Sequence, residues 1–255
     1  MATQRKALPN RGGKWPSVLA GVAMLLLAAA ALMMVGAGPA YRFEFITLGE
    51  AFNLLRNGVY VAAGAVAVSI LVLLVSIIAR RMTPALFATL VLAGAVALLY
   101  VPWQHWQRAQ DVPAIHDITT DTQNPPVFEA LAEAREAAPN AVDYPGEATA
   151  QQQRAAYPSI RPLIVNDALQ TVLAAAQAEV EEAGWQIAQI TDHQIEATAT
   201  TRWFGFEDDV VIRLAELDES VQVDMRSASR LGASDVGTNA ARIETFLRAL
   251  EARFE

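Results

Sequence analysis

An uncharged run of 18 residues, 84–101, most constrains how this chain can fold. As a helix, the run would rise about 27 Å, which is close to the thickness of a bilayer's hydrocarbon core. Pro102 and Trp103 follow it. The run therefore predicts a membrane-spanning helix, with a membrane part before it and a water-soluble part after it.

Two more uncharged runs precede this one, at residues 17–38 and 59–79. We therefore predict a three-helix transmembrane anchor over residues 1–110, with spans at about 17–38, 59–79 and 84–102. A cleaved signal peptide is the alternative for the first run, although that run is longer than a usual signal-peptide core. None of the runs contains an ionisable residue, which argues against an ion or proton pathway.

The charges divide the chain in the same way. Residues 1–110 carry nine Lys or Arg and two acidic residues, a net charge of +7, and residues 111–255 carry ten Arg and 25 acidic residues, a net charge of −15. The acidic part would be repelled by phosphate backbones, so no nucleic acid is expected as a partner. We expect the lipid bilayer as a partner, with envelope proteins or a lipid as further candidates. The chain has no cysteine, which excludes disulfides and thiol chemistry.

Basic residues predict the orientation of the anchor. Four of them, including Lys14, precede the first span, and Arg80 and Arg81 separate the second span from the third. The positive-inside rule places these segments in the cytoplasm, so the N-terminus is expected there and the C-terminal domain in the periplasm. Arg outnumbers Lys by 17 to two, which is typical of GC-rich bacterial genomes. We therefore expect a multi-pass protein of the bacterial inner membrane.

The segment between the first two spans, residues 39–58, has a local helix signal. Thr47 and Glu50 have the spacing of a capping box, and Phe45, Leu48, Phe52 and Leu55 share one helical face. This pattern predicts a short helix lying on the membrane surface. A loop packed on the spans is the alternative.

The soluble part is predicted to be an α+β domain. Residues 111–160 read as an extended, irregular lead-in with a short helix near 128–137, and 161–255 form the core. A capping box of Asp167 and Gln170 would start the first core helix, and Gly184 would end it. Alternating strands are expected at 162–165, 185–191, 195–203, 210–214 and 221–225, with a last helix after Asp235. This order predicts an antiparallel sheet with helices on one face.

Two stretches resemble the bacterial domain of unknown function 1499 family. They are IHDITTDTQNPPVF, residues 115–128, and RSASRLGASDVGTNAARI, residues 226–243. The resemblance covers about residues 111–253. It implies a small domain that is often joined to membrane spans, with no established activity and no catalytic residues to transfer.

The first stretch contains the candidate metal site, His116, Asp117 and Asp121. A His and two carboxylates are suitable ligands for a divalent cation. Three ligands within six residues rarely converge on a segment without a clear helix or strand, so turn and cap roles are the simpler interpretation.

The second stretch runs from a strand into a helix, and its Arg226, Arg230 and Arg242 suit an anion. Asp235 would occupy the same amides itself. We therefore favour a structural clasp in which Arg230 or Arg242 pairs with Asp117 or Asp121. The candidate residues, for a clasp or a ligand site, are His116, Asp117, Asp121, Arg226, Ser229, Arg230, Ser234, Asp235, Asn239 and Arg242.

The sequence favours a non-catalytic binding or assembly module of the cell envelope, with no cofactor. One alternative is a metal-assisted hydrolase that uses His116, Asp117 and Asp121. Another is a pocket for a lipid or small molecule between the sheet and its helices. The apolar cluster at 203–206, followed by three acidic residues, is interpreted as core plus a solvated turn, or as a partner contact if it is exposed.

Overall fold

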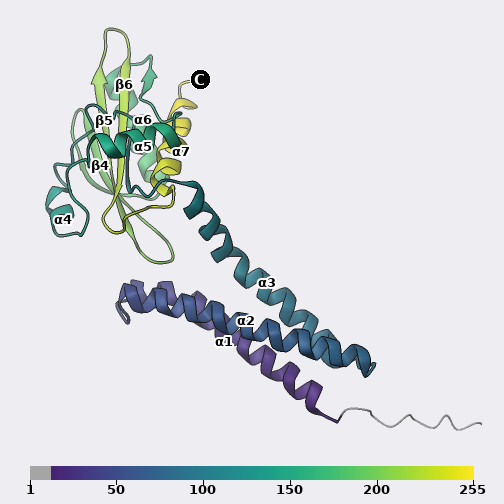
Figure 1. The fold of residues 1–255 in the computed structure, drawn as a ribbon. Coiled ribbons are helices and arrows are strands. Elements are labelled where there is room, and N and C mark those ends of the chain that lie inside the picture. Colours follow the sequence, from purple (N-terminus) through teal and green to yellow (C-terminus); the bar gives the residue numbers. More distant parts are fainter. Residues whose placement is uncertain (1–12) are drawn as a thin grey trace, which may run out of the picture. The chain divides into compact units, whose positions relative to one another are not determined.

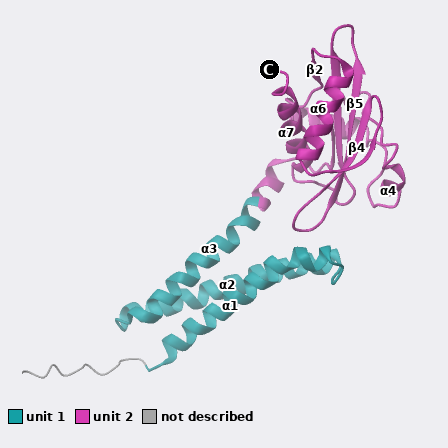
Figure 2. Cartoon of the chain, turned by 180° about the vertical axis from the view of Figure 1, so that it is seen from behind, with its two compact units in different colours: residues 1–104 teal, residues 105–255 magenta. Residues whose placement is uncertain are grey.

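The computed structural model describes residues 13–255 and contains two compact units, residues 1–104 and residues 105–255 (Figure 1; Figure 2). The first unit holds α1 (Trp15–Arg42), α2 (Leu48–Ile78) and most of α3 (Met82–Asp111). Each of these helices is long and apolar enough to cross a membrane. The predicted three apolar helices are confirmed.

Small side chains fill the contacts among the three helices. Ala20 of α1, Val72 of α2 and Ala88 of α3 form one buried cluster. A second cluster contains Ala23, Ala65 and Val91. Small residues at these positions let helix backbones approach closely, which favours association in a lipid environment.

The connection between α1 and α2 is shorter than predicted. α1 continues to Arg42 and α2 begins at Leu48, so the expected surface helix is the first part of α2 instead. Its capping box is real: the Thr47 side chain accepts from the Glu50 N–H, and the Glu50 carboxylate accepts from the Thr47 N–H at 2.8 Å. A good cap stabilises whatever helix follows it, whether short or long.

The second unit is built on an antiparallel sheet of six strands. The strand order is β1-β6-β5-β4-β3, and β2 pairs with the same edge of β6 as β1 does, further along. The predicted α+β class is confirmed. The elements are β1 (Asp117–Thr119), α4 (Ala132–Glu136), α5 (Glu147–Ala156), β2 (Leu163–Val165), α6 (Leu169–Glu182), β3 (Gln186–Ile190), β4 (Gln194–Thr200), β5 (Glu207–Glu216), β6 (Val221–Ser229) and α7 (Thr238–Glu251).

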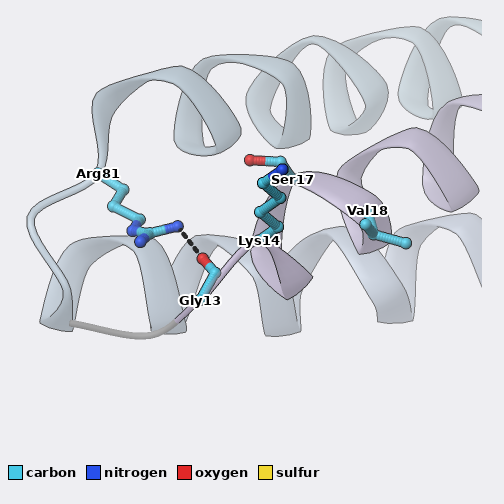
Figure 3. A pocket seen from close by; sticks show the side chains of 5 residues that line it. All are labelled: Gly13, Lys14, Ser17, Val18 and Arg81. Carbon is cyan, nitrogen blue, oxygen red and sulfur yellow. Dashed lines mark hydrogen bonds between the residues drawn. The ribbon is translucent and has the colours of Figure 1, made fainter. Parts of the chain in front are cut away.

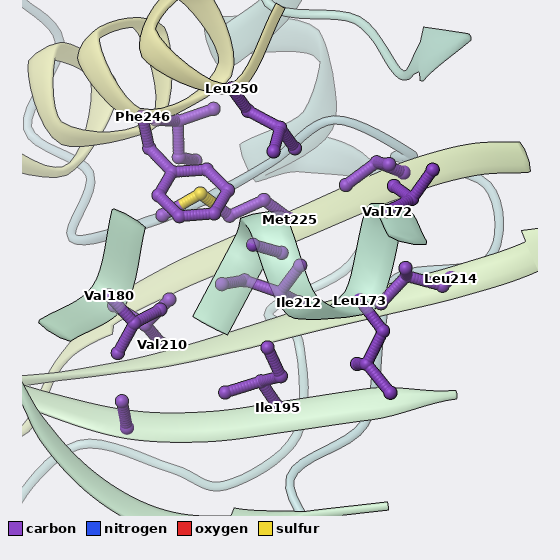
Figure 4. Close-up of a cluster of buried hydrophobic side chains, with 14 of the residues drawn as sticks. Val172, Leu173, Val180, Ile195, Val210, Ile212, Leu214, Met225, Phe246 and Leu250 are labelled. Carbon is purple, nitrogen blue, oxygen red and sulfur yellow. The ribbon is translucent and has the colours of Figure 1, made fainter. Parts of the chain in front are cut away.

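The main core lies between one face of this sheet and helices α6 and α7 (Figure 4). Val172 and Val180 of α6 and Phe246 of α7 meet Ile212 and Met225 of the strands there. The buried side chains fill this interface, which is where the sequence analysis placed a lipid or small-molecule pocket. Because side chains alternate along a strand, the strand residues that lie between these core residues in the sequence face the other side of the sheet.

The opposite face, here called the helix-free face because neither α6 nor α7 packs on it, is covered by the lead-in segment. Phe128, Leu131 and Val142 of that segment pack on Val211 and Ala228 of the sheet. The segment is more regular than predicted, because it contains β1, α4 and α5. Short elements of this kind carry weak sequence periodicity, and their contacts with the sheet stabilise them.

Two local predictions need correction. The first core helix has Ala168 as its N-cap with no side-chain hydrogen bond, so the capping box of Asp167 and Gln170 is not formed. Strand β6 continues to Ser229, so Arg226 lies in a strand and not in a turn. The helix does end as expected: Gly184 adopts a φ of 71°, which suits glycine.

Candidate functional site

The two motifs singled out in the sequence meet where β1 pairs with β6. Asp117 lies opposite Ala228, Ile118 opposite Ser227, and Thr119 opposite Arg226. This register sends Asp117 and Arg226 to the helix-free face, and Ser227 and Ser229 toward α7. The candidate residues are therefore distributed over both faces of the sheet.

On the helix-free face, Arg226 forms a bidentate ion pair with Asp117. Its Nε lies 3.0 Å from Oδ1 and its Nη2 lies 2.8 Å from Oδ2. The same guanidinium donates to the carbonyls of Pro126 and Val142 at 3.2 and 2.8 Å. Both charged side chains are buried, so this pair ties the first motif to the second without access to solvent.

A clasp between the two motifs therefore exists, but the prediction named the wrong arginine: Arg226, and not Arg230 or Arg242, holds Asp117. Arg230 instead binds Asp209 of β5 through two bonds of 2.9 and 2.8 Å and also contacts Glu207. The hydrogen bonds that Arg230 donates to Asp209 raise the pKa of Arg230 above its ordinary value. Arg242 of α7 binds Asp208 at 2.6 Å.

These partners come from an acidic run that the sequence analysis interpreted as a solvated turn. Asp208 and Asp209 instead lie in strand β5 and are buried. As consecutive strand residues they point to opposite faces, so Asp208 pairs with α7 while Asp209 pairs on the helix-free face.

On the helix side, a polar cluster joins α7 to β6. The Ser227 hydroxyl donates to the side-chain Oδ1 of Asn239 at 2.7 Å, and Arg242 donates to both oxygens. The Asn239 amide donates to Ser229 Oγ at 3.0 Å and to the His116 carbonyl at 2.9 Å. Ser227 is fully buried, which places its hydroxyl out of reach of a substrate.

Asp235 and Ser234 organise the start of α7. The Asp235 carboxylate accepts from the N–H groups of Gly237 and Asn239 at 2.9 and 2.7 Å, and Ser234 Oγ accepts from Val236 at 3.2 Å. Burial raises the pKa of Asp235 above its ordinary value, while the two N–H groups oppose this rise. The carboxylate therefore occupies the amides that an incoming anion would need.

His116, Asp117 and Asp121 do not form a metal site. Asp121 accepts from the N–H groups of Gln123 and Asn124 at 3.0 and 2.9 Å and pairs with Arg213 at 3.3 Å. Both Asp117 oxygens hold Arg226. Within residues 13–255, no three His, Asp or Glu side chains converge as metal ligands would.

His116 borders a pocket of about 420 Å³. Asn140, Thr149, Gln152 and Gly232 also line it. The His116 Nδ1 atom is buried and has no hydrogen-bond partner within the described residues. A buried polar atom of this kind favours a water or a ligand group that hydrogen-bonds to it.

Arg135, which no sequence pattern singled out, completes the buried charges of the helix-free face. Its Nη1 lies 3.1 Å from Asp209 Oδ2 and 2.9 Å from the Ala228 carbonyl. The guanidinium groups of Arg135 and Arg226 each lie 4.7 Å from the centre of the Phe128 ring. Burial lowers the pKa of Arg135 below its ordinary value. The short helix α4 has no local signal that marks this arginine as buried.

Glu196 and Gln153 were missed as well. The Glu196 carboxylate accepts from the N–H groups of residues 129, 130 and 131 at 2.8, 3.1 and 3.0 Å, which holds the turn before α4. The Gln153 amide accepts from Thr119 N at 3.0 Å and donates to Thr119 O at 2.6 Å, so it covers the edge of β1. For Glu196 a sequence signal was available, because its side chain is charged and the other side chains of β4 are uncharged.

The family model described as "Protein of unknown function (DUF1499)" matches residues 117–250. This match begins at β1 and ends in α7, so it spans the whole sheet, residues 117–128 of the first stretch that carried the resemblance and all of the second. The chain belongs to the DUF1499 family. A comparison with curated proteins gives no match. Membership in DUF1499 confirms the family predicted from the sequence and brings no activity with it.

Proposed function

We propose that this DUF1499 protein is a non-catalytic binding or assembly module of the bacterial cell envelope. The observation that supports this is that three buried carboxylates form ion pairs with arginines: Asp117 with Arg226, Asp209 with Arg230, and Asp208 with Arg242. A general acid, base or nucleophile needs access to a substrate and a proton to exchange. Ion pairs of this kind instead make the domain rigid, which suits a domain that presents a fixed surface to a binding partner.

The charge distribution supports an outward orientation of the second unit. Lys14 precedes α1, and Arg80 and Arg81 lie in the turn between α2 and α3, while Arg5, Lys6 and Arg11 lie outside the described residues. The positive-inside rule then predicts a cytoplasmic N-terminus and a periplasmic C-terminus in the inner membrane.

The orientation is tested with alkaline phosphatase and green fluorescent protein fused in turn to the C-terminus. We expect phosphatase activity and no fluorescence. Fusions within the turn at Arg80 and Arg81 serve as the control and should give the reverse. Fluorescence at the C-terminus would overturn the orientation.

An exposed aromatic surface supports a partner contact. Trp203 is 42% exposed, and its ring meets Phe204, which stacks on Phe206. Aromatic side chains held by their neighbours make effective anchors at protein interfaces. We propose that this cluster contacts another envelope protein, while the strongly acidic domain avoids nucleic acid.

Affinity isolation of the full-length protein in detergent tests the assembly role. Trp203→Ala should remove a copurifying envelope protein. Leu217→Ala, which changes another exposed apolar residue (47% exposed), should retain it. Identical copurifying proteins for wild type and Trp203→Ala would overturn the role of this surface.

A small-molecule pocket beside His116 is the second candidate, favoured by the unpartnered Nδ1 atom. Among residues 13–255, no Asp, Glu, Lys or Arg lines this pocket, which suits a small polar ligand that is neutral overall. Native mass spectrometry of the full-length protein should then show a bound mass that His116→Ala removes and His193→Ala retains. No bound mass in the wild type would exclude a tightly held ligand.

A further inference from the structure

A second pocket lies in the first unit, where α1 begins and where the turn between α2 and α3 ends (Figure 3). It has a volume of about 620 Å³ and is lined by Gly13, Lys14, Ser17, Val18 and Arg81. The Arg81 guanidinium donates to the Gly13 carbonyl at 2.5 Å, drawn as a dashed line in Figure 3. This bond joins the two segments that form the pocket and holds Arg81 beside it.

The charge at this pocket is positive. Lys14 and Arg81 line it, and Arg80 is adjacent in the chain. The acidic residues of the first 110 positions are Glu44 and Glu50, which lie at or near the connection between α1 and α2, at the other ends of these helices. The pocket therefore favours an anion.

An apolar stripe leads away from the pocket along α1. Val18, Val22 and Leu25 are 61, 40 and 73% exposed, and their spacing places them on one face of the helix. In a membrane helix, side chains exposed in this way contact acyl chains. An anionic pocket ligand with an apolar tail fits both features better than a free anion does.

We propose that this pocket binds the phosphate group of an anionic phospholipid at the membrane–water boundary. The Lys14 ammonium and the Arg81 N–H groups not used by Gly13 donate charge-assisted hydrogen bonds to phosphate oxygens. The Ser17 hydroxyl supplies a further donor, and the stripe of Val18, Val22 and Leu25 contacts the acyl chains. The proposal does not depend on which side of the membrane this end of the anchor faces.

Native mass spectrometry of the full-length detergent-solubilised protein tests the proposal, with phosphatidylglycerol and phosphatidylcholine added separately. We expect bound phosphatidylglycerol in excess over phosphatidylcholine. Replacing both Lys14 and Arg81 by Gln should weaken phosphatidylglycerol binding by about 25-fold, since each cation near an anionic surface contributes roughly fivefold. Arg56→Gln removes a cation from the other end of α2 and should leave binding unchanged.

The charge-preserving double variant Lys14→Arg and Arg81→Lys separates lost charge from lost folding, and it should retain most of the binding. Equal binding of the two lipids would overturn the proposal, as would unchanged binding after the double Gln substitution. Inorganic phosphate in excess should not displace the lipid. If it does, the pocket takes a free anion and the lipid assignment is wrong.

Discussion

The Arg226 guanidinium and the Asp117 carboxylate face each other through two hydrogen bonds, Nε to Oδ1 at 3.0 Å and Nη2 to Oδ2 at 2.8 Å. Their side chains are 2% and 1% exposed, and 109 residues separate them in the chain. The pair fixes β1 against β6 and holds the lead-in segment through the carbonyls of Pro126 and Val142.

Removing one partner of the buried pair should be costly. Asp117→Asn leaves Arg226 buried without its counter-charge and should reduce the free energy of unfolding by about 3–5 kcal/mol. The double variant Asp117→Leu with Arg226→Met should lose less than the sum of the two single variants. Thermal unfolding of the full-length protein in detergent measures both. Glu147→Gln changes a solvent-exposed pair with Arg154 and should have little effect.

Glu196→Gln should loosen the turn before α4. The carboxylate serves three backbone N–H groups, and an amide side chain offers only one acceptor oxygen. We expect a loss of about 1–3 kcal/mol in stability and faster hydrogen exchange at residues 129–131. Glu216→Gln, at the exposed end of β5, is the control. Unchanged exchange at residues 129–131 would contradict the role of Glu196.

Gln153→Ala should expose the edge of β1. Gln153 pairs with both backbone groups of Thr119, so its loss frees that N–H to exchange. Loss of a hydrogen bond worth about 1 kcal/mol predicts roughly fivefold faster exchange of the Thr119 amide. The exposed neighbour Gln151, changed to Ala, should leave this amide unaffected. Equal exchange rates in the two variants would mean that other contacts protect the edge.

Gly58→Ala should disturb the packing of α1 on α2. A Cβ atom at Gly58 would lie 2.5 Å from the Met34 Cγ atom and 3.3 Å from the Ala30 carbonyl oxygen. Relieving these contacts should cost about 1–3 kcal/mol. At Gly64, in the same helix, a Cβ would meet no atom within 4 Å, so Gly64→Ala is the matched control. If detergent unfolds Gly58→Ala and Gly64→Ala equally readily, α1 and α2 do not approach closely at Gly58.

Asp235 should make stability depend on pH. Burial raises its pKa in the folded protein above the ordinary 3.8. A raised pKa contributes stability that is present below 3.8 and lost as the pH rises through the folded-state pKa. The melting temperature of the wild type relative to that of Asp235→Asn should therefore fall as the pH rises above 3.8 and through the folded-state pKa.

Asp218→Asn, in an exposed turn, is the control for this titration, because its own pH profile should parallel the wild type. The opposite result would be a wild-type melting temperature that rises relative to that of Asp235→Asn as the pH increases. It would show that the N–H groups of Gly237 and Asn239 lower the pKa by more than burial raises it.

The apolar helices, the antiparallel sheet and the protein family could be predicted from the sequence because each has a local signal in it. A long uncharged run marks α3, alternation marks β4, and a 3.6-residue period marks α7. The boundaries of α2 were predicted less well, because the capping box at Thr47 marks a helix start without indicating how far the helix continues.

The tertiary structure alone decided which charges meet. Arg226, Arg230 and Arg242 lie within 17 positions, and the sequence favoured Arg230 or Arg242, not Arg226, as the partner of Asp117 or Asp121. The alternation of β5 and β6 sends Asp208 and Asp209 to opposite faces, and the register of β1 on β6 brings Asp117 to Arg226. A shift of one residue in either pairing would reverse those faces. The partners therefore depend on the register between strands, and β1 and β6 lie about 110 residues apart in the chain.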